Sequence, residues 1–171
     1  MPRTPARQPV TAPVEPRAAI EPPVRVLRKF RLVFNAVKTH FKQVEKRAGV
    51  GGAQLWALSV VQGQPGMGVN DLARAMDIHQ STASNLVKAL VAAGLLAAEK
   101  NGVDRRAVQL RVLAAGTRVL RKAPSPFAGV LADALQHLTP DALERLDRDL
   151  GDLLKVLKAD ARAAGTPLAD M

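Results

Sequence analysis

Hydrophobic positions between Val69 and Val112 form two stretches with a helical period, separated by a short break. A third stretch follows in which hydrophobic and polar residues alternate. Asn70 is a favoured N-cap residue, and the helix that it predicts has an acid in its first turn, where the helix dipole favours one. After a break at residues 75–82, a second helix is predicted up to Gly94, with four apolar residues on one face: Leu86, Val87, Leu90 and Val91.

The alternating part predicts a half-buried strand, because Val108, Leu110 and Val112 are separated by polar residues. A turn cluster at residues 100–106 precedes it and contains two adjacent arginines. Helix, turn, helix and basic hairpin together predict a winged helix-turn-helix. The second helix begins with short polar side chains, as a helix that enters the DNA major groove requires, although a plain surface helix also favours Ser and Thr.

Two further helices have apolar seams with spacings of three and four. The first spans residues 24–47, and its seam is Leu27, Phe30, Phe34, Val37, Phe41 and Val44. The second starts at Thr139-Pro140, a strong helix start, and its seam is Leu143, Leu146, Leu150, Leu153 and Leu157. Neither seam has an evident partner within the winged domain, which indicates an intersubunit bundle. Shorter helices are expected at residues 53–61, 114–122 and 127–138.

The charge is unevenly distributed along the chain. The net charge is +10, and residues 24–48 hold eight basic residues and one acid, while residues 94–123 hold seven and two. Such clustering is typical of a protein that binds a polyanion, although the basic stripe of the first helix also fits a solvated face. The chain has no cysteine, which excludes disulfides and cysteine-ligated zinc. It has no long apolar run, so we expect a cytoplasmic protein that does not enter a membrane.

The segments that carry these patterns resemble the MarR family of bacterial transcriptional regulators. The resemblance is strongest in GVGGAQLWAL (49–58), LARAMDIHQSTASNLVKALVAAGLL (72–96) and DRRAVQLRVLAAG (104–116), and weaker over 24–157. It implies a mainly α fold with a small β-wing. The expected division is a disordered Pro-rich tail at 1–23, a protomer at 24–164 and a frayed C-terminus at 165–171. Within the protomer we expect a winged core at 52–113 and dimerisation helices at 24–48 and 114–160.

The resemblance also implies the functional residues. The expected DNA contacts are Gln80, Ser81, Thr82, Ser84, Asn85, Lys88, Lys100, Arg105 and Arg106. The family's small-molecule pocket lies between the first two helices and the DNA-binding lobe, so His40 and Trp56 are candidate ligand contacts, with a half-buried structural histidine and a core tryptophan as the simpler interpretations. No catalytic or metal site is expected, because the three histidines lack metal-ligand spacing and no catalytic motif is present.

Several positions depart from the family pattern, among them Asp77, His79, Gln80 and Asn85. Asp77 stands where the turn between the two helices usually has Gly, and His79-Gln80 replaces the usual Ser-Pro, so the second helix is expected to start near Ser81. Asn85 stands where Arg is common, and Asn can bond bidentately to adenine.

The expected function is a dimeric DNA-binding repressor, without cofactor, that recognises a palindromic operator and is released by a small aromatic carboxylate or phenolic effector. The alternative is an effector-independent nucleoid-type DNA-binding protein. An enzyme is not expected.

Overall fold

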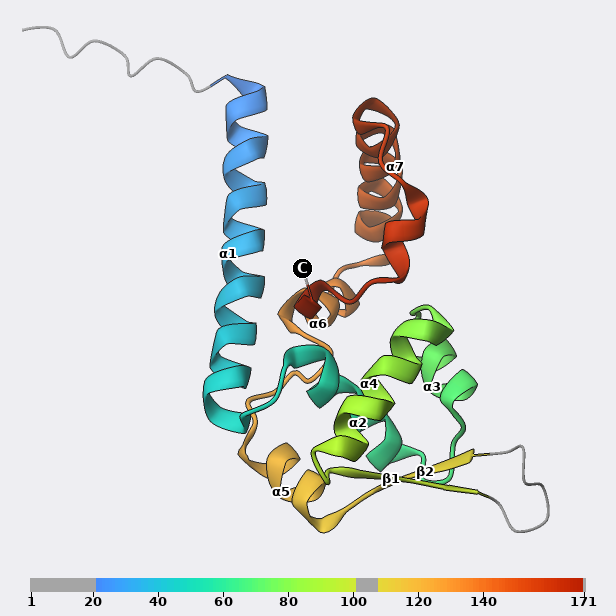
Figure 1. Cartoon of the computed structure of the whole chain (residues 1–171). Coiled ribbons are helices and arrows are strands. Elements are labelled where there is room, and N and C mark those ends of the chain that lie inside the picture. Colours follow the sequence, from blue (N-terminus) through green and yellow to red (C-terminus); the bar gives the residue numbers. More distant parts are fainter. Residues whose placement is uncertain (1–20, 101–107, 171) are drawn as a thin grey trace, which may run out of the picture.

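The computed structural model of the 171-residue chain describes residues 21–100 and 108–170. Two long helices, α1 (Pro22–Ala48) and α7 (Pro140–Leu157), extend to the same side of a smaller lobe (Figure 1). That lobe, called the winged-helix lobe below, contains α2 (Gly52–Gly63), α3 (Val69–Ala75), α4 (Gln80–Ala92), β1 (Leu96–Lys100) and β2 (Val108–Val112). Helices α5 (Ala114–Lys122) and α6 (Val130–Gln136) connect it to α7. The mainly helical fold with a small wing is confirmed.

The core of the winged-helix lobe is aliphatic. Its largest fully buried side chains are Leu55, Leu58, Val61, Leu72, Met76, Leu90, Leu96 and Leu110, joined by Val44 from the end of α1. Burying each such side chain contributes about 1.5–3 kcal/mol relative to leaving it exposed. These residues come from every element of the lobe, so the orientation of each helix depends on the others.

The wing is an antiparallel pair in which Leu96 lies opposite Val112 and Ala98 opposite Leu110. As the alternation predicts, Leu110 is buried while Gln109 and Arg111 are exposed. The loop before α3 is also bound to the wing, because the amide of Gly66 donates to the carbonyl of Leu110 and the amide of Leu110 donates to that of Met67, both at 2.9 Å. These bonds attach the hairpin to the helix-turn-helix.

Several predicted boundaries differ from the structure. The N-cap of α3 is Gly68 and not Asn70, because the Gly68 amide is capped by the carboxylate of Asp71. Helix α4 starts at Gln80, with His79 as its N-cap, rather than at Ser81. Helix α1 begins at Pro22, which belongs to the segment expected to be disordered, since proline is well tolerated in a first helical turn. The remainder of that expected tail, residues 1–20, lies outside the described residues.

Other boundaries agree with the prediction. Gly94 follows α4 in the left-handed conformation at φ 67°. The hydroxyl oxygen of Thr139 caps α7 by accepting from the amide of Ala142 at 3.3 Å. The helix expected at 127–138 is shorter and spans Val130–Gln136.

The C-terminus is not frayed as expected over residues 165–170. After α7 the chain folds back through two short 3-10 turns, η1 (Ala161–Gly165) and η2 (Leu168–Asp170). Pro167 is buried, and Ala169 packs against the core beside α2. The small side chains that suggested fraying are those that fit against α1 and α2, where Gly52 leaves room for Ala169.

Both predicted seams remain largely uncovered in the single chain. Leu27 is 49% exposed and Phe34 is 64% exposed, although Val44 at the other end of α1 is buried. On α7, Leu157 is 64% exposed. Large side chains exposed along two helices form an apolar surface that a folded monomer rarely leaves in water.

Gly116 sets the position of α5 and gives a first prediction. A Cβ atom there would lie 2.4 Å from the carbonyl oxygen of Leu95 and 2.8 Å from Val112 Cγ1. We expect Gly116→Ala to lower the free energy of unfolding by about 1–3 kcal/mol, because the backbone must shift. Gly63→Ala is the control, since nothing lies within 4 Å of that position. Urea unfolding of both variants checks this, and equal stabilities would show that α5 does not need the close approach.

Candidate nucleic-acid interface

Helix α4 separates its side chains into an inner and an outer face. The inner face is buried and consists of Ala83, Leu86, Val87 and Leu90. Val91, which the sequence pattern assigned to this face, is 41% exposed. Ser81, Asn85 and Lys88 are exposed at spacings of four and three, which places them on one outer face. Burial of the inner face therefore fixes the direction in which the polar face points.

The other expected contacts on α4 lie around this face. Gln80 is exposed at the first helical position, and Thr82 and Ser84 are half-buried. Ser84 is three residues from Ser81 and shares its face, while Thr82 lies to one side. The structure thus brings the six expected residues of α4 to the first two and a half turns of one helix.

The turn before α4 holds its start in place. Asp77 adopts φ 51°, the left-handed conformation for which relatives usually have Gly. The next amide, that of Ile78, donates to the carbonyl of Ala73 at 3.0 Å, and the carbonyl of His79 accepts from the amide of Ala83 at 3.0 Å. The replacement of Gly by Asp is therefore accommodated without loss of the turn.

The start of α3 is fixed by Asp71. Its carboxylate accepts from the Gly68 amide at 3.1 Å and pairs with Arg74 on the next turn. The backbone hydrogen bond from Gly68, followed by that from Arg74, lowers the pKa of the Asp71 carboxyl below its ordinary value of 3.8. Since the pKa is lowered on folding, this cap contributes at neutral pH and is lost only as the pH falls through the folded-state value.

The wing supplies one cation whose position is described. Arg111 on β2 forms an ion pair with Glu99 on β1, with 2.6 Å between Nη2 and Oε1. Both side chains are more than half exposed, so the pair contributes little to stability. Lys100 ends β1, but its side chain is not described, and the expected contacts Arg105 and Arg106 lie outside the described residues.

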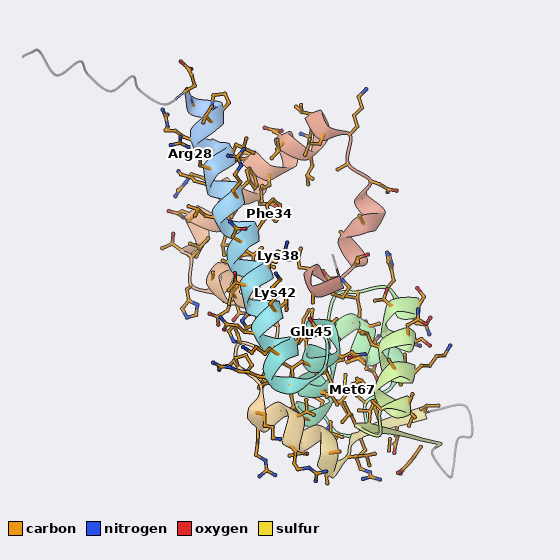
Figure 2. The ribbon with its side chains drawn as sticks, turned by 60° about the vertical axis from the view of Figure 1, so that its left-hand side comes forward. Arg28, Phe34, Lys38, Lys42, Glu45 and Met67 are labelled. Carbon is orange, nitrogen blue, oxygen red and sulfur yellow. The ribbon has the colours of Figure 1, made fainter. Side chains whose placement is uncertain are left out.

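Two cavities lie between the winged-helix lobe, α1 and the C-terminal segment. The smaller has a volume of about 240 Å³, and Phe41, Trp56, Ile78, Phe127 and Leu168 are among its lining residues. The larger, about 560 Å³, lies along α1 and is lined by Phe34, Val37, Lys38, Phe41, Lys42, Glu45, Gly51, Gly52, Leu168 and Ala169. Figure 2 shows Phe34, Lys38, Lys42 and Glu45 following one another along α1.

The two expected ligand contacts occupy different places. Trp56 is half-buried and lines the smaller cavity. His40 is 7% exposed, lines neither cavity, and lies edge to face against Phe41 with 5.4 Å between ring centroids. Its Nε2 atom has no hydrogen-bond partner among the described residues. His40 is therefore buried and contacts neither of these two cavities directly.

Sequence reasoning missed the cations of the larger cavity. Lys38 and Lys42 belong to the basic stripe of α1, which equally suggested a solvated face. Their spacing of four, with Phe34 and Phe41 on the same side, is a signal of a mixed apolar and cationic wall. This spacing indicates a cavity wall only in combination with η2, which closes the opposite side of the larger cavity.

Residues 21–100 and 108–170 contain neither a metal-binding cluster nor a membrane-spanning helix. No group of three or more His, Cys, Asp or Glu side chains there could hold a metal ion. No helix of that part is long and apolar enough to cross a membrane.

The comparisons with known proteins agree with this geometry. Residues 48–107 match the model of the MarR family. A MepR-like protein complexed with pseudoligands is 17% identical with a TM-score of 0.56, over 78% of this chain and 94% of that one. The MepR–DNA complex from S. aureus is 18% identical with a TM-score of 0.55, over 80% and 99%. YusO from Bacillus subtilis is 19% identical with a TM-score of 0.51, over 77% and 94%. None of the curated proteins matches the chain.

At these identities the solved structures establish the fold, and the family model establishes the relationship of the winged-helix lobe. The match begins at Ala48, where α1 ends, and includes α2, α3, α4 and the first strand of the wing. The resemblance predicted from the sequence is thereby confirmed. Residues 48–107 match the MarR-family model, and the described part of the chain has the fold of the MepR and YusO structures.

Proposed function

We propose that this chain is a sequence-specific DNA-binding transcriptional regulator that acts as a dimeric repressor. The observation that carries the proposal is the outer face of α4, which presents short polar side chains. The opposite face of α4 is apolar and buried, and a β-hairpin lies beside the helix. A helix in the major groove needs short donors and acceptors at its start, and a hairpin beside it reaches the neighbouring backbone. The DNA complex of the similarly folded MepR supports this mode of binding.

The residues of this surface divide into two groups by chemistry. Gln80, Ser81, Ser84 and Asn85 can read base edges, and the amide of Asn85 matches adenine in two hydrogen bonds. Lys88 lies one turn further along the same face, where a cation meets phosphate and positions the helix. Lys100, Arg105 and Arg106 are proposed as phosphate or groove contacts of the wing. Arg111 is already paired with Glu99, so it adds less to binding.

We expect Asn85→Ala to weaken binding to the preferred operator by about 1–3 kcal/mol and to relax base preference at one position. Lys88→Ala should weaken binding to all sequences alike and reduce the salt dependence by about one released ion. Lys29→Ala is the control, because Lys29 is exposed at the far end of α1. Operator titrations at several salt concentrations, beside melting curves, check this. If neither α4 variant differed from the control, α4 would not be the reading helix.

The dimer is argued from the uncovered seams. Helices α1 and α7 extend to the same side of the winged-helix lobe (Figure 1). Their exposed apolar residues include Leu27, Phe34 and Leu157. A second copy supplies the same apolar faces and covers them by symmetry. The two α4 helices are then related by a two-fold axis, so the operator is expected to be palindromic.

We expect a homodimer at micromolar concentration that Leu153→Asp dissociates, because a carboxylate placed in an apolar seam is buried without a partner. Leu153 is 37% exposed in the single chain. Val91→Asp is the matched control, since Val91 is also an exposed apolar residue but belongs to the winged-helix lobe. Light scattering of both variants measures the assembly. A monomeric wild type, or equal loss of dimer in both variants, would contradict the assignment of the seam.

The effector is proposed to be a small aromatic carboxylate or a phenol. Phe34 and Phe41 provide apolar walls in the larger cavity, and Lys38 and Lys42 provide cations for an anionic group. Trp56 offers a flat wall in the smaller cavity, whereas His40 lines neither cavity and is not part of the proposed ligand site. A ligand that fits the cavities in only one arrangement of α1 and the winged-helix lobe favours that arrangement, and hence one DNA affinity.

We expect Lys42→Gln to leave operator affinity nearly unchanged and to raise the salicylate concentration needed for half release by about tenfold, because a charged hydrogen bond contributes about 1.5–3 kcal/mol. Lys46→Gln is the control, one turn along α1 and outside the cavity lining. A DNA titration at increasing salicylate makes the comparison. The effector-independent nucleoid-type protein remains the alternative, and it predicts that salicylate has no effect on any of the three proteins.

A further inference from the structure

The C-terminal strap, defined here as residues 161–170, lies across the cleft between α1, α2 and the start of α4. Its second 3-10 turn lies on the N-terminal end of α2, where a Cβ atom on Gly52 would be 2.9 Å from the Cβ of Ala169 and 2.3 Å from Phe41. Pro167 is buried and Ala169 is half-buried against the core. The strap is therefore seated in a fitted position.

The same segment forms a wall common to both cavities. Leu168 and Ala169 line the smaller and the larger cavity, and Ala164, Thr166 and Pro167 add to the smaller one. Phe41 and Gly52 also line both cavities, from the opposite side. Without the strap, the two cavities would join into one continuous space, namely the cleft that the strap crosses. The strap thus takes up volume that a ligand in this cleft would need.

The other end of the strap reaches the helix-turn-helix. The carbonyl of Gly165 accepts a hydrogen bond from the amide of His79 at 3.3 Å. A Cβ atom on Gly165 would lie 2.6 Å from the imidazole of His79, so the backbone of Gly165 packs closely against that ring. His79 is the N-cap of α4 and directly precedes Gln80. One short segment therefore connects the cleft with the start of the proposed reading helix.

We propose that the strap is a built-in, displaceable occupant of this cleft, and that its release frees the start of α4. An aromatic anion that occupies the space common to both cavities displaces η2, which also removes the carbonyl of Gly165 from His79. Two short turns with few buried side chains belong to the least stable parts of a fold and open locally at small free-energy cost. The apparent affinity of the cleft for a ligand is reduced by the fraction of molecules in which the strap is seated.

The link to DNA release rests on the proposed function, but the occupancy of the cleft does not. The experiment therefore uses 8-anilinonaphthalene-1-sulfonate, an aromatic anion whose fluorescence reports apolar binding, and needs no DNA. The test variant is Ala169→Lys in the full chain, because a long side chain does not fit beside Gly52. Its cation is also repelled by the positive end of α2 and by Lys38 and Lys42, which outnumber Glu45 in the cavity lining. Ala163→Lys is the matched control, at an exposed position of η1.

We expect Ala169→Lys to bind the dye about tenfold more tightly than wild type, with Ala163→Lys unchanged. A chain ending at Ala159 should bind the dye as tightly as Ala169→Lys does. This second variant tests the same expectation if Ala169→Lys does not fold. Adding Ala132→Trp, which fills the smaller cavity from α6, should abolish the gain. Equal dye affinity in Ala169→Lys, the truncated chain and wild type would overturn the proposal, as would a gain that survives Ala132→Trp.

The coupling to α4 has its own measurement. In the wild type, the dye should accelerate hydrogen exchange of the His79 amide several-fold, followed by NMR, because displacement removes its acceptor. In Ala169→Lys this amide should exchange rapidly even without dye. A His79 amide that exchanges at the same rate in all samples would show that the strap does not act on α4. A chain that passes these tests but binds no operator would contradict the proposed function alone.

Discussion

The fold depends on one interaction, the burial of the inner face of α4 against α2 and the wing. Leu86 and Leu90 enter a core whose other members, such as Leu55 and Leu110, come from different elements. Such interiors are packed as densely as crystals, so α4 cannot rotate without creating voids. The outer face of α4 is consequently held in one direction. Burial of the apolar side chains therefore fixes the orientation of the polar side chains on the opposite face.

A second constraint is the apolar surface that the single chain cannot cover. The same helix α1 contributes Val44 to the core of the winged-helix lobe and leaves Phe34 largely exposed. Any partner that covers the exposed part is therefore rigidly connected, through one helix, to the position of α4. A dimer built on α1 and α7 would make the distance between the two reading helices sensitive to small changes at the base of α1, where the larger cavity lies.

Sequence patterns predicted the elements whose signals are local. The cap at Thr139, the stop at Gly94 and the alternation around Leu110 each depend on neighbours in the chain, and each is present in the structure. Prediction failed at two places, one decided by a neighbouring side chain and the other by a contact distant in sequence. Gly68 replaced Asn70 as N-cap because a carboxylate three residues later bonds its amide, and the C-terminus folded back because Gly52 offers space for Ala169. The outer face of α4 was predictable from spacing, whereas the cations of the cleft required knowledge of what lies opposite them.

The contacts of the C-terminal strap are weak enough for a ligand to displace it. A segment anchored by large apolar side chains would close the cleft permanently, and one with no fitted contact would not close it at all. Here the described anchors include Pro167, the methyl group of Ala169 and a hydrogen bond of 3.3 Å from the amide of His79 to the carbonyl of Gly165. Small side chains bury little area, so their removal from the cleft costs only a few kcal/mol, which a tightly bound small molecule can supply. The same scarcity of large residues that made this segment resemble a frayed tail is what makes it displaceable.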